Sequence, residues 1–391
     1  ALGCNTEGCQ NTAMGMSALI ANTTGDNNVA IGRLALTANT TADNNTAVGM
    51  CSLKANTTGT NGVAVGCGAL KSNTEGGCNV AVGRISLQDN TTGANNVAIG
   101  ASALQSNTTA SDNVAIGKSA LTATLTGCRN VAIGTQALLS NTADNNVAVG
   151  FCALKTNSSG ANNTAVGRFS LLLNQTGATN TAVGQNSLHS NTTAADNTAV
   201  GAVSLYANTT GTKNVAVGKN ALCANTTASD NTAVGWESLC SNTTGAGNVA
   251  VGKSALCKNT IGCNNTAVGV ATLDANTEGE CNSAFGKASL TVNTTGDSNT
   301  AMGACALVLN ETASNNTAVG FKSLFSTTTG GLNVAVGSFT LDSNTTGTNN
   351  TSIGYNSLTA NTTGTNNVAL GQHAGKAITT STGNTIIGVN A

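Results

Sequence analysis

A seventeen-residue repeat anchored on glycine is the feature that most constrains how this chain can fold. Anchor glycines stand at Gly15 and every seventeenth residue to Gly134, then, after one sixteen-residue step, at Gly150 and every seventeenth residue to Gly388. The result is 23 copies. A repeat of this length predicts one small structural unit per copy, stacked on its neighbours. Positions are numbered below from the anchor glycine, so that position −1 precedes it and position +4 lies four residues after it.

The three residues before each anchor glycine have the pattern of a β-strand. Position −1 is always apolar, as in Ile31 and Val48, and position −3 is Val or Thr, with Ser283 as the one variant. Position −2 is Ala in all copies except at Ser352 and Ile386. This alternation predicts a strand with one β-branched face and one face restricted to a methyl group. A small residue at a fixed position indicates close packing, against either a narrow interior or a neighbouring chain.

The remainder of each copy is rich in turn-forming residues. Position +4 is Leu except at Gly375, and position −4 is Asn except at Gly62. Asn-Thr usually occupies positions +7 and +8, and runs such as Thr24–Asn27 follow. Each copy is therefore predicted to contain a strand, a tight turn at the glycine, a second short strand around Leu, an Asn-rich corner and a Thr-Gly loop. Two turn clusters per copy leave no room for a helix.

These patterns predict an all-β, parallel β-solenoid of about 23 turns. We expect a single continuous solenoid over residues 1–391, with a divergent last repeat at 372–391. At a strand spacing of ~4.8 Å it would be a rod on the order of 110 Å long. Stacked Asn side chains are expected to form amide ladders, each interruption marked by Thr124 or Thr327 in place of Asn. Neither end has a polar cap, so we expect either a segment of a longer array or self-stacking.

The composition disfavours several classes of protein. The chain has no proline, 8% charged residues and a formal net charge of −1, which offers no electrostatic basis for binding nucleic acid or anionic membrane. Its 40% apolar residues at fixed spacing are not typical of disorder. No apolar run approaches the ~20 residues of a membrane-spanning helix, and no signal peptide is recognisable at the start.

The strand motif resembles the head repeats of trimeric autotransporter adhesins of the YadA type. Their Asn-x-Val-Ala-Ile-Gly motif is similar to Asn28–Gly32 and Asn96–Gly100. The longer unit, such as Asn231–Gly245, is similar to repeats of phage tail fibres and bacterial surface fibres. The resemblance covers the whole chain and implies a left-handed β-roll, commonly trimeric, in an extracellular or virion fibre. This chain departs from the adhesin heads in its longer repeat and its many cysteines.

The thirteen cysteines are candidates for disulfides between neighbouring turns. Three occupy position +5 in consecutive copies, where stacked Cα atoms would fall inside the disulfide range of about 4.4–6.8 Å. Other candidates are pairs in adjacent copies. The full set is Cys223, Cys240, Cys257, Cys263, Cys281, Cys51 and Cys67. An extracellular location favours disulfides, although buried thiols are the alternative. The odd number leaves at least one thiol free or bonded to another chain.

The sequence offers little material for catalysis. His189 and His373 lie far apart in variable positions, and the absence of a Cys-x-x-Cys pair disfavours a zinc site. Corner carboxylates such as Asp26 and Asp230 suit Asx turns rather than an acid–base pair. Weak Ca²⁺ binding at these corners is the alternative. We therefore expect no enzyme activity, no cofactor, and no catalytic or metal-binding residues.

Positions +1, +2 and +5 vary freely, and contacts with partners would lie there. The candidate contact residues are Trp236, Phe151, Phe321 and Tyr355; the alternative is that these positions are exposed and unconstrained.

The predicted function is a non-catalytic structural subunit of an extracellular or virion fibre or filament, assembling through uncapped solenoid ends or laterally. The expected partner is the chain itself, with no nucleic acid and no membrane insertion. The first alternative is an adhesin that binds a cell-surface or glycan ligand through its variable positions. The second is an ice-binding solenoid with a threonine array that includes Thr23 and Thr40.

Overall fold

The computed structural model describes residues 1–391 as two compact units, Ala1–Asp196 and Asn197–Ala391. Each unit is a parallel β-solenoid with one three-residue strand per turn, and consecutive strands start seventeen residues apart except at the single sixteen-residue step. The predicted all-β solenoid is thus confirmed, and the chain forms no helix. The left-handed sense of the coil and its continuity as one rod through 1–391 stay predictions.

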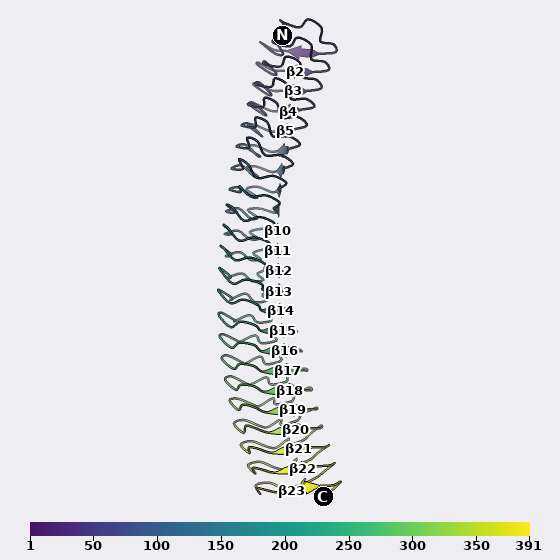
Figure 1. The fold of residues 1–391 in the computed structure, drawn as a ribbon, viewed down its shortest axis with the longest axis vertical. Helices are drawn as coiled ribbons and strands as arrows, with labels where there is room; N and C mark the ends of the chain where they lie inside the picture. Colours follow the sequence, from purple (N-terminus) through teal and green to yellow (C-terminus); the bar gives the residue numbers. More distant parts are fainter. The chain divides into compact units, whose positions relative to one another are not determined.

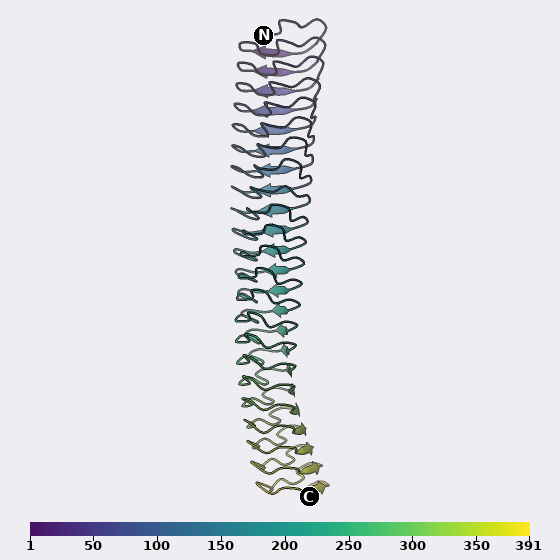
Figure 2. The ribbon, with the colours of Figure 1, turned by 60° about the vertical axis from the view of Figure 1, so that its left-hand side comes forward.

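The strands of each unit lie one beside the next in chain order (Figures 1 and 2). The first unit contains β1 Thr12–Met14, β2 Val29–Ile31, β3 Thr46–Val48, β4 Val63–Val65, β5 Val80–Val82, β6 Val97–Ile99, β7 Val114–Ile116, β8 Val131–Ile133, β9 Val147–Val149, β10 Thr164–Val166 and β11 Thr181–Val183. The second contains β12 Thr198–Val200, β13 Val215–Val217, β14 Thr232–Val234, β15 Val249–Val251, β16 Thr266–Val268, β17 Ser283–Phe285, β18 Thr300–Met302, β19 Thr317–Val319, β20 Val334–Val336, β21 Thr351–Ile353, β22 Val368–Leu370 and β23 Thr385–Ile387.

Like residues stack on like residues along the sheet of each unit. In β4 and β5, for example, Val63 pairs with Val80 and Ala64 with Ala81 in parallel register. Both alanines are fully buried, whereas the residues on either side of them remain half-buried or exposed. The strand face that carries only the alanine methyl groups therefore points into the interior. The β-branched face points outward.

The second strand expected around each leucine is absent, and that prediction is wrong. Leu34 and Leu36 have φ values of 59° and 48°, in the left-handed region, so this segment is a series of turns. Ala35 and Leu36 are both fully buried, whereas a strand would place adjacent residues on opposite faces. The leucine N–H still bonds to a neighbouring turn, because Leu36 donates to the carbonyl of Ser52 at 3.0 Å. Leucine burial, worth about 1.5–3 kcal/mol, offsets a left-handed cost of about 1–2 kcal/mol.

Two buried columns of asparagine connect the turns, which confirms the predicted ladder. At position +7, Asn39 Nδ2 donates to Asn22 Oδ1 at 2.9 Å and to the carbonyl of Ala42 at 3.0 Å. At position −4, Asn28 Nδ2 donates to the carbonyl of Ala42 at 2.9 Å, while its Oδ1 accepts the backbone N–H of Asn45 at 3.0 Å. Each amide thus satisfies backbone groups at a corner that water does not reach.

The position +7 ladder is interrupted where a residue other than Asn takes the next place. Buried Oδ1 atoms without a hydrogen-bond partner occur at Asn107, Asn310 and Asn361. The residues that replace Asn in the following turns are Thr124, Thr327 and Ile378. The sequence predicted the first two interruptions. The third interruption belongs to the divergent last repeat, where the side chain of Ile378 has no hydrogen-bond donor.

The anchor glycine is required by the close approach of the next turn. Gly66 has a φ of +133°, and a Cβ there would lie 2.5 Å from the carbonyl oxygen of Gly83. By contrast, Gly68 has a φ of +70° and open surroundings, with only Ile85 Cγ2 at 3.4 Å. Of these two positions, only Gly66 must therefore be glycine because of its contact with the backbone of the next turn.

Restoring the asparagine amide at position 327 of the ladder should stabilise the second unit locally. Thr327→Asn would place an Nδ2 donor next to the unpaired Asn310 Oδ1, and an amide oxygen next to Asn344 Nδ2, which now lies 3.5 Å from Thr327 Oγ1. We expect a gain of about 1 kcal/mol, seen as roughly fivefold slower amide exchange over residues 310–345. Hydrogen exchange with mass spectrometry measures this effect, because stability in a solenoid is local. The control is Thr329→Asn, at an exposed position of the same turn. Equal protection in both variants would contradict the role given to the ladder.

Two glycines of one turn should respond differently to the same substitution. Gly66→Ala is expected to open the neighbouring turns at a cost above about 3 kcal/mol, because backbone must move and φ is strained. Gly68→Ala is expected to cost about 1 kcal/mol, since Ala271 and Ala288 adopt φ values of 52° and 54° at the same position. Limited proteolysis and hydrogen exchange of the two variants distinguish these outcomes. Similar protection in both would show that the contact with Gly83 is not limiting.

Candidate functional site

The outer strand face, defined as the side chains at positions −3 and −1 of every strand, is uncharged throughout. All 23 strands consist of apolar residues with Thr or Ser, and position −1 is apolar in each. Large side chains on this face are partly open to solvent, with exposed fractions of 39% for Ile99, 38% for Phe285 and 46% for Leu370. Because the strand backbone is already bonded between turns, this face offers side-chain contacts alone.

An aromatic column lies on four consecutive turns of the second unit. It comprises Phe321, Phe339, Tyr355 and His373, whose ring centroids are separated by 5.3, 6.2 and 5.6 Å in that order, each pair edge to face. In two of the three ring pairs the N–H at position +2 bonds to the carbonyl at position +1 of the preceding turn, at 2.9 Å for both Phe339 with Phe321 and His373 with Tyr355. Lys322 Nζ lies 5.7 Å from the Phe321 ring centroid and adds a cation beside the column.

The four contact residues predicted from the sequence are exposed but do not form one site. Phe321 and Tyr355 belong to the aromatic column, with exposed fractions of 44% and 47%. Phe151 lies in the first unit, where its ring contacts that of Phe169 at 5.5 Å. Trp236, 43% exposed, contacts Lys253 instead of another ring.

Sequence reasoning missed two members of the column, Phe339 and His373. Both occupy position +2, and their neighbours in the column occupy position +1. The signal that would have found them is aromatic residues alternating between these two positions in consecutive copies.

All thirteen cysteines are free thiols in the structure, which contains no disulfide bond. The position +5 cysteines nevertheless lie together, with Cys223 Sγ and Cys240 Sγ 3.3 Å apart. The backbone holds them in register, because Ala224 N–H donates to the Cys240 carbonyl at 3.1 Å and Ser241 N–H to the Cys257 carbonyl at 2.9 Å. We name Cys223, Cys240 and Cys257 the thiol column.

The other cysteine pairs are placed less closely. Cys281 N–H donates to the Cys263 carbonyl at 3.1 Å, so their backbones are adjacent. Cys51 instead bonds through its N–H to Arg33, and the carbonyl of Cys67 accepts from Ile85. Cys51 and Cys67 are thus not bonded to each other through their backbones, and the disulfides expected from the sequence stay predictions.

Hydrogen bonding along the thiol column separates the acidities of its members. A hydrogen bond from Cys240 lowers the pKa of Cys223 below that of an ordinary thiol. The same hydrogen bond, with burial adding to it, raises the pKa of Cys240 to about 11. The pKa of Cys257 is also raised, by its hydrogen bond to Cys240 and then by burial. Cys223 is thus the member that most readily becomes a thiolate.

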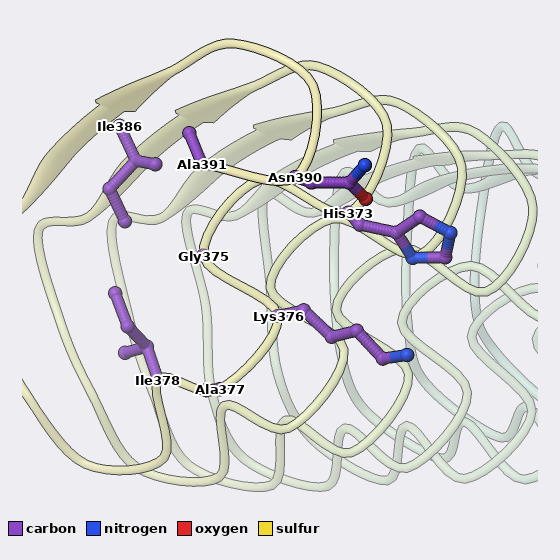
Figure 3. Close-up of a pocket in the computed structure, with 8 residues that line it drawn as sticks. All are labelled: His373, Gly375, Lys376, Ala377, Ile378, Ile386, Asn390 and Ala391. Atoms are coloured by element: carbon purple, nitrogen blue, oxygen red, sulfur yellow. The ribbon is translucent and has the colours of Figure 1, made fainter.

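A pocket of about 540 Å³ lies at the last turn (Figure 3). Ile378 and Ile386 point toward each other across the interior of this turn, beside Gly375, while His373 and Lys376 point away from them. The two isoleucines stand where other copies have Asn and Ala, and Gly375 where they have Leu. The pocket is therefore the open side of a repacked core layer, and it lacks the convergent polar groups of a ligand site.

No group of three or more His, Cys, Asp or Glu side chains is arranged to hold a metal ion. The structure contains no helix long and apolar enough to cross a membrane. No protein-family model matches the chain, and no curated protein matches it. The likeness to adhesin head and fibre repeats therefore rests on the motifs in the sequence.

Proposed function

We propose that this chain is a non-catalytic structural subunit of an extracellular or virion fibre, and that copies associate laterally through the outer strand face. The observation that carries the proposal is the exposure of an apolar residue at position −1 in turn after turn, as at Val251 and Val336, each 36% exposed. Contiguous apolar surface of this kind is typical of protein interfaces.

A second copy of the chain is the partner that suits this face. The face repeats with the period of the turns, so an identical chain offers matching side chains at every turn. It carries no charge, and the net charge of −1 gives little repulsion between copies. The location outside the cell or on a virion comes from the resemblance to fibre repeats. End-to-end stacking is the alternative route of assembly.

Charges on the outer strand face should abolish lateral assembly without unfolding the chain. In the variant Val251→Lys with Val336→Lys, we expect loss of the assembled species in analytical ultracentrifugation and electron microscopy, with an unchanged far-ultraviolet spectrum, because burying unpaired ammonium groups is costly. The control, Ala202→Lys with Ala304→Lys, adds the same charge at position +1, where Lys219 and Lys253 already occur.

Three outcomes bear on this proposal. A wild-type chain that stays monomeric at all concentrations would refute it, as would a control that loses assembly to the same extent. Filaments that persist in the strand-face variant would instead support stacking through the ends. Running the samples with and without reductant separates assembly held by disulfides from assembly held by the strand face.

The aromatic column supports a second candidate function, an adhesin that binds a cell-surface glycan. Four adjacent rings, two of them more than 40% exposed, form a continuous apolar and polarizable strip with Lys322 at one end. Exposed aromatic residues are the type that dominates binding energy at recognition surfaces. For ice binding the geometry is less suitable, because threonine hydroxyls such as Thr23 Oγ1 donate along the stack, here to the Thr40 carbonyl at 3.0 Å.

Removing the column should abolish glycan binding if the adhesin function is correct. Phe321→Ala with Tyr355→Ala is expected to lower affinity on a glycan array at least tenfold, which corresponds to about 1.4 kcal/mol. Phe151→Ala is the control, since it removes an equally exposed ring outside the column. Trp236→Ala tests the remaining contact residue. Saturable binding that survives the double substitution would assign adhesion to another surface, and no binding by the wild type would leave the fibre subunit as the function.

A further inference from the structure

We propose that the thiol column is a thiol–disulfide exchange site, at which a small-molecule disulfide converts Cys223 and Cys240 into a covalent link between two adjacent turns. The two sulfur atoms are 3.3 Å apart, and Cys223 Sγ also lies 3.3 Å from the Cys240 carbonyl oxygen. The inference concerns this chain alone and does not depend on fibre assembly or adhesion.

The column has the geometry that exchange requires. Successive cysteines stand at the same position of consecutive turns, and hydrogen bonds between turns fix their backbones on both sides, from Ala207 to the Cys223 carbonyl at 3.0 Å and from Ala224 to the Cys240 carbonyl at 3.1 Å. Parallel stacking places such Cα atoms within the range that a disulfide spans. Each thiol is half-buried, so a small oxidant has access while the column stays ordered.

The three thiols differ in a way that gives the reaction an order. Cys223 accepts a hydrogen bond from Cys240, which lowers its pKa and supplies the attacking thiolate. Cys240 keeps its proton until the first step is complete and then becomes the resolving thiol. Cys257 lies on the far side of Cys240, with the carboxylate of Asp274 adding to the rise in its pKa.

The steps balance as an exchange of two electrons. The Cys223 thiolate attacks one sulfur of a disulfide R–S–S–R, forms a mixed disulfide and releases R–S⁻, which takes the proton of Cys240. The Cys240 thiolate then attacks the Cys223 sulfur and expels the second R–S⁻, which is protonated from solvent. Two protein thiols are oxidised to one disulfide while one R–S–S–R is reduced to two R–SH. Attack by Cys257 on Cys240 afterwards moves the bond by one turn with no net oxidation.

The tryptic map of the chain separates these products. Cys223 and Cys240 lie within one peptide, residues 220–253, whereas Cys257 lies in residues 254–258. The full chain is treated with oxidised glutathione, alkylated with N-ethylmaleimide, denatured and digested. We expect peptide 220–253 to lose both alkylatable thiols and the mass of two hydrogen atoms. Cys51 and Cys67, which occupy different positions of adjacent copies and are not bonded to each other through their backbones, are the internal control and should show only alkylation or separate glutathione adducts.

Three variants test the order of the reaction. Cys223→Ser should shift the bond to Cys240 and Cys257, so that peptides 220–253 and 254–258 become linked. Cys257→Ser should retain the bond within 220–253. In Cys240→Ser no bond should form, and glutathione should remain attached to Cys223. Circular dichroism confirms that each variant is folded.

Two results would overturn the proposal. One is a peptide 220–253 that reacts with glutathione no faster than Cys51 and Cys67 and forms no internal bond. The other is a Cys240→Ser chain in which peptide 220–253 becomes disulfide-linked to peptide 254–258 instead of keeping glutathione on Cys223, which would show that contact between adjacent turns plays no part.

Discussion

The structure depends on how closely each turn stacks on the next. At the anchor glycine the following turn approaches to a distance that excludes even a methyl group, as between Gly66 and Gly83. The interior of each turn is narrow and holds alanine at position −2 and leucine at position +4, with buried asparagine at the corners. The close stacking also places the corner amides at the distance at which Asn39 reaches Asn22. The repeat is strict because one residue that alters the spacing would disturb the bonds of two neighbouring turns.

The local structure could be predicted from the sequence wherever identical residue types stack on one another in consecutive turns. This rule predicted the strand, the methyl-lined face, the Asn ladder and its interruptions at Thr124 and Thr327. It failed at Leu36, because nothing in the residue type reveals a left-handed conformation that leucine rarely adopts. There, burial of two adjacent side chains and bonding to neighbouring turns override the intrinsic preference of the backbone.

Stacking is staggered at the variable positions, which sequence reasoning did not anticipate. Position +2 of one turn lies on position +1 of the turn before, so Phe339 lies on Phe321. In the same way the N–H of Cys51 bonds to the Arg33 carbonyl, and the Cys67 carbonyl accepts the N–H of Ile85. At position +5 the side chains of the same position meet, with Cys223 Sγ 3.3 Å from Cys240 Sγ.

The outer strand face carries a constraint that the interior does not explain. Within each strand it is position −2, alanine in all copies but two, that faces inward, whereas position −1 lies on the outer side of the strand. Preference for β-structure is not a sufficient reason either. Threonine favours strands as valine does and is common at position −3, yet it never occurs at position −1, whereas Phe285, Met302 and Leu370 do. What these residues share is an apolar side chain, not branching at Cβ. This apolar residue on an exposed face is the reason for our proposal that the face contacts another molecule, and the period of the face makes an identical chain the simplest partner to propose.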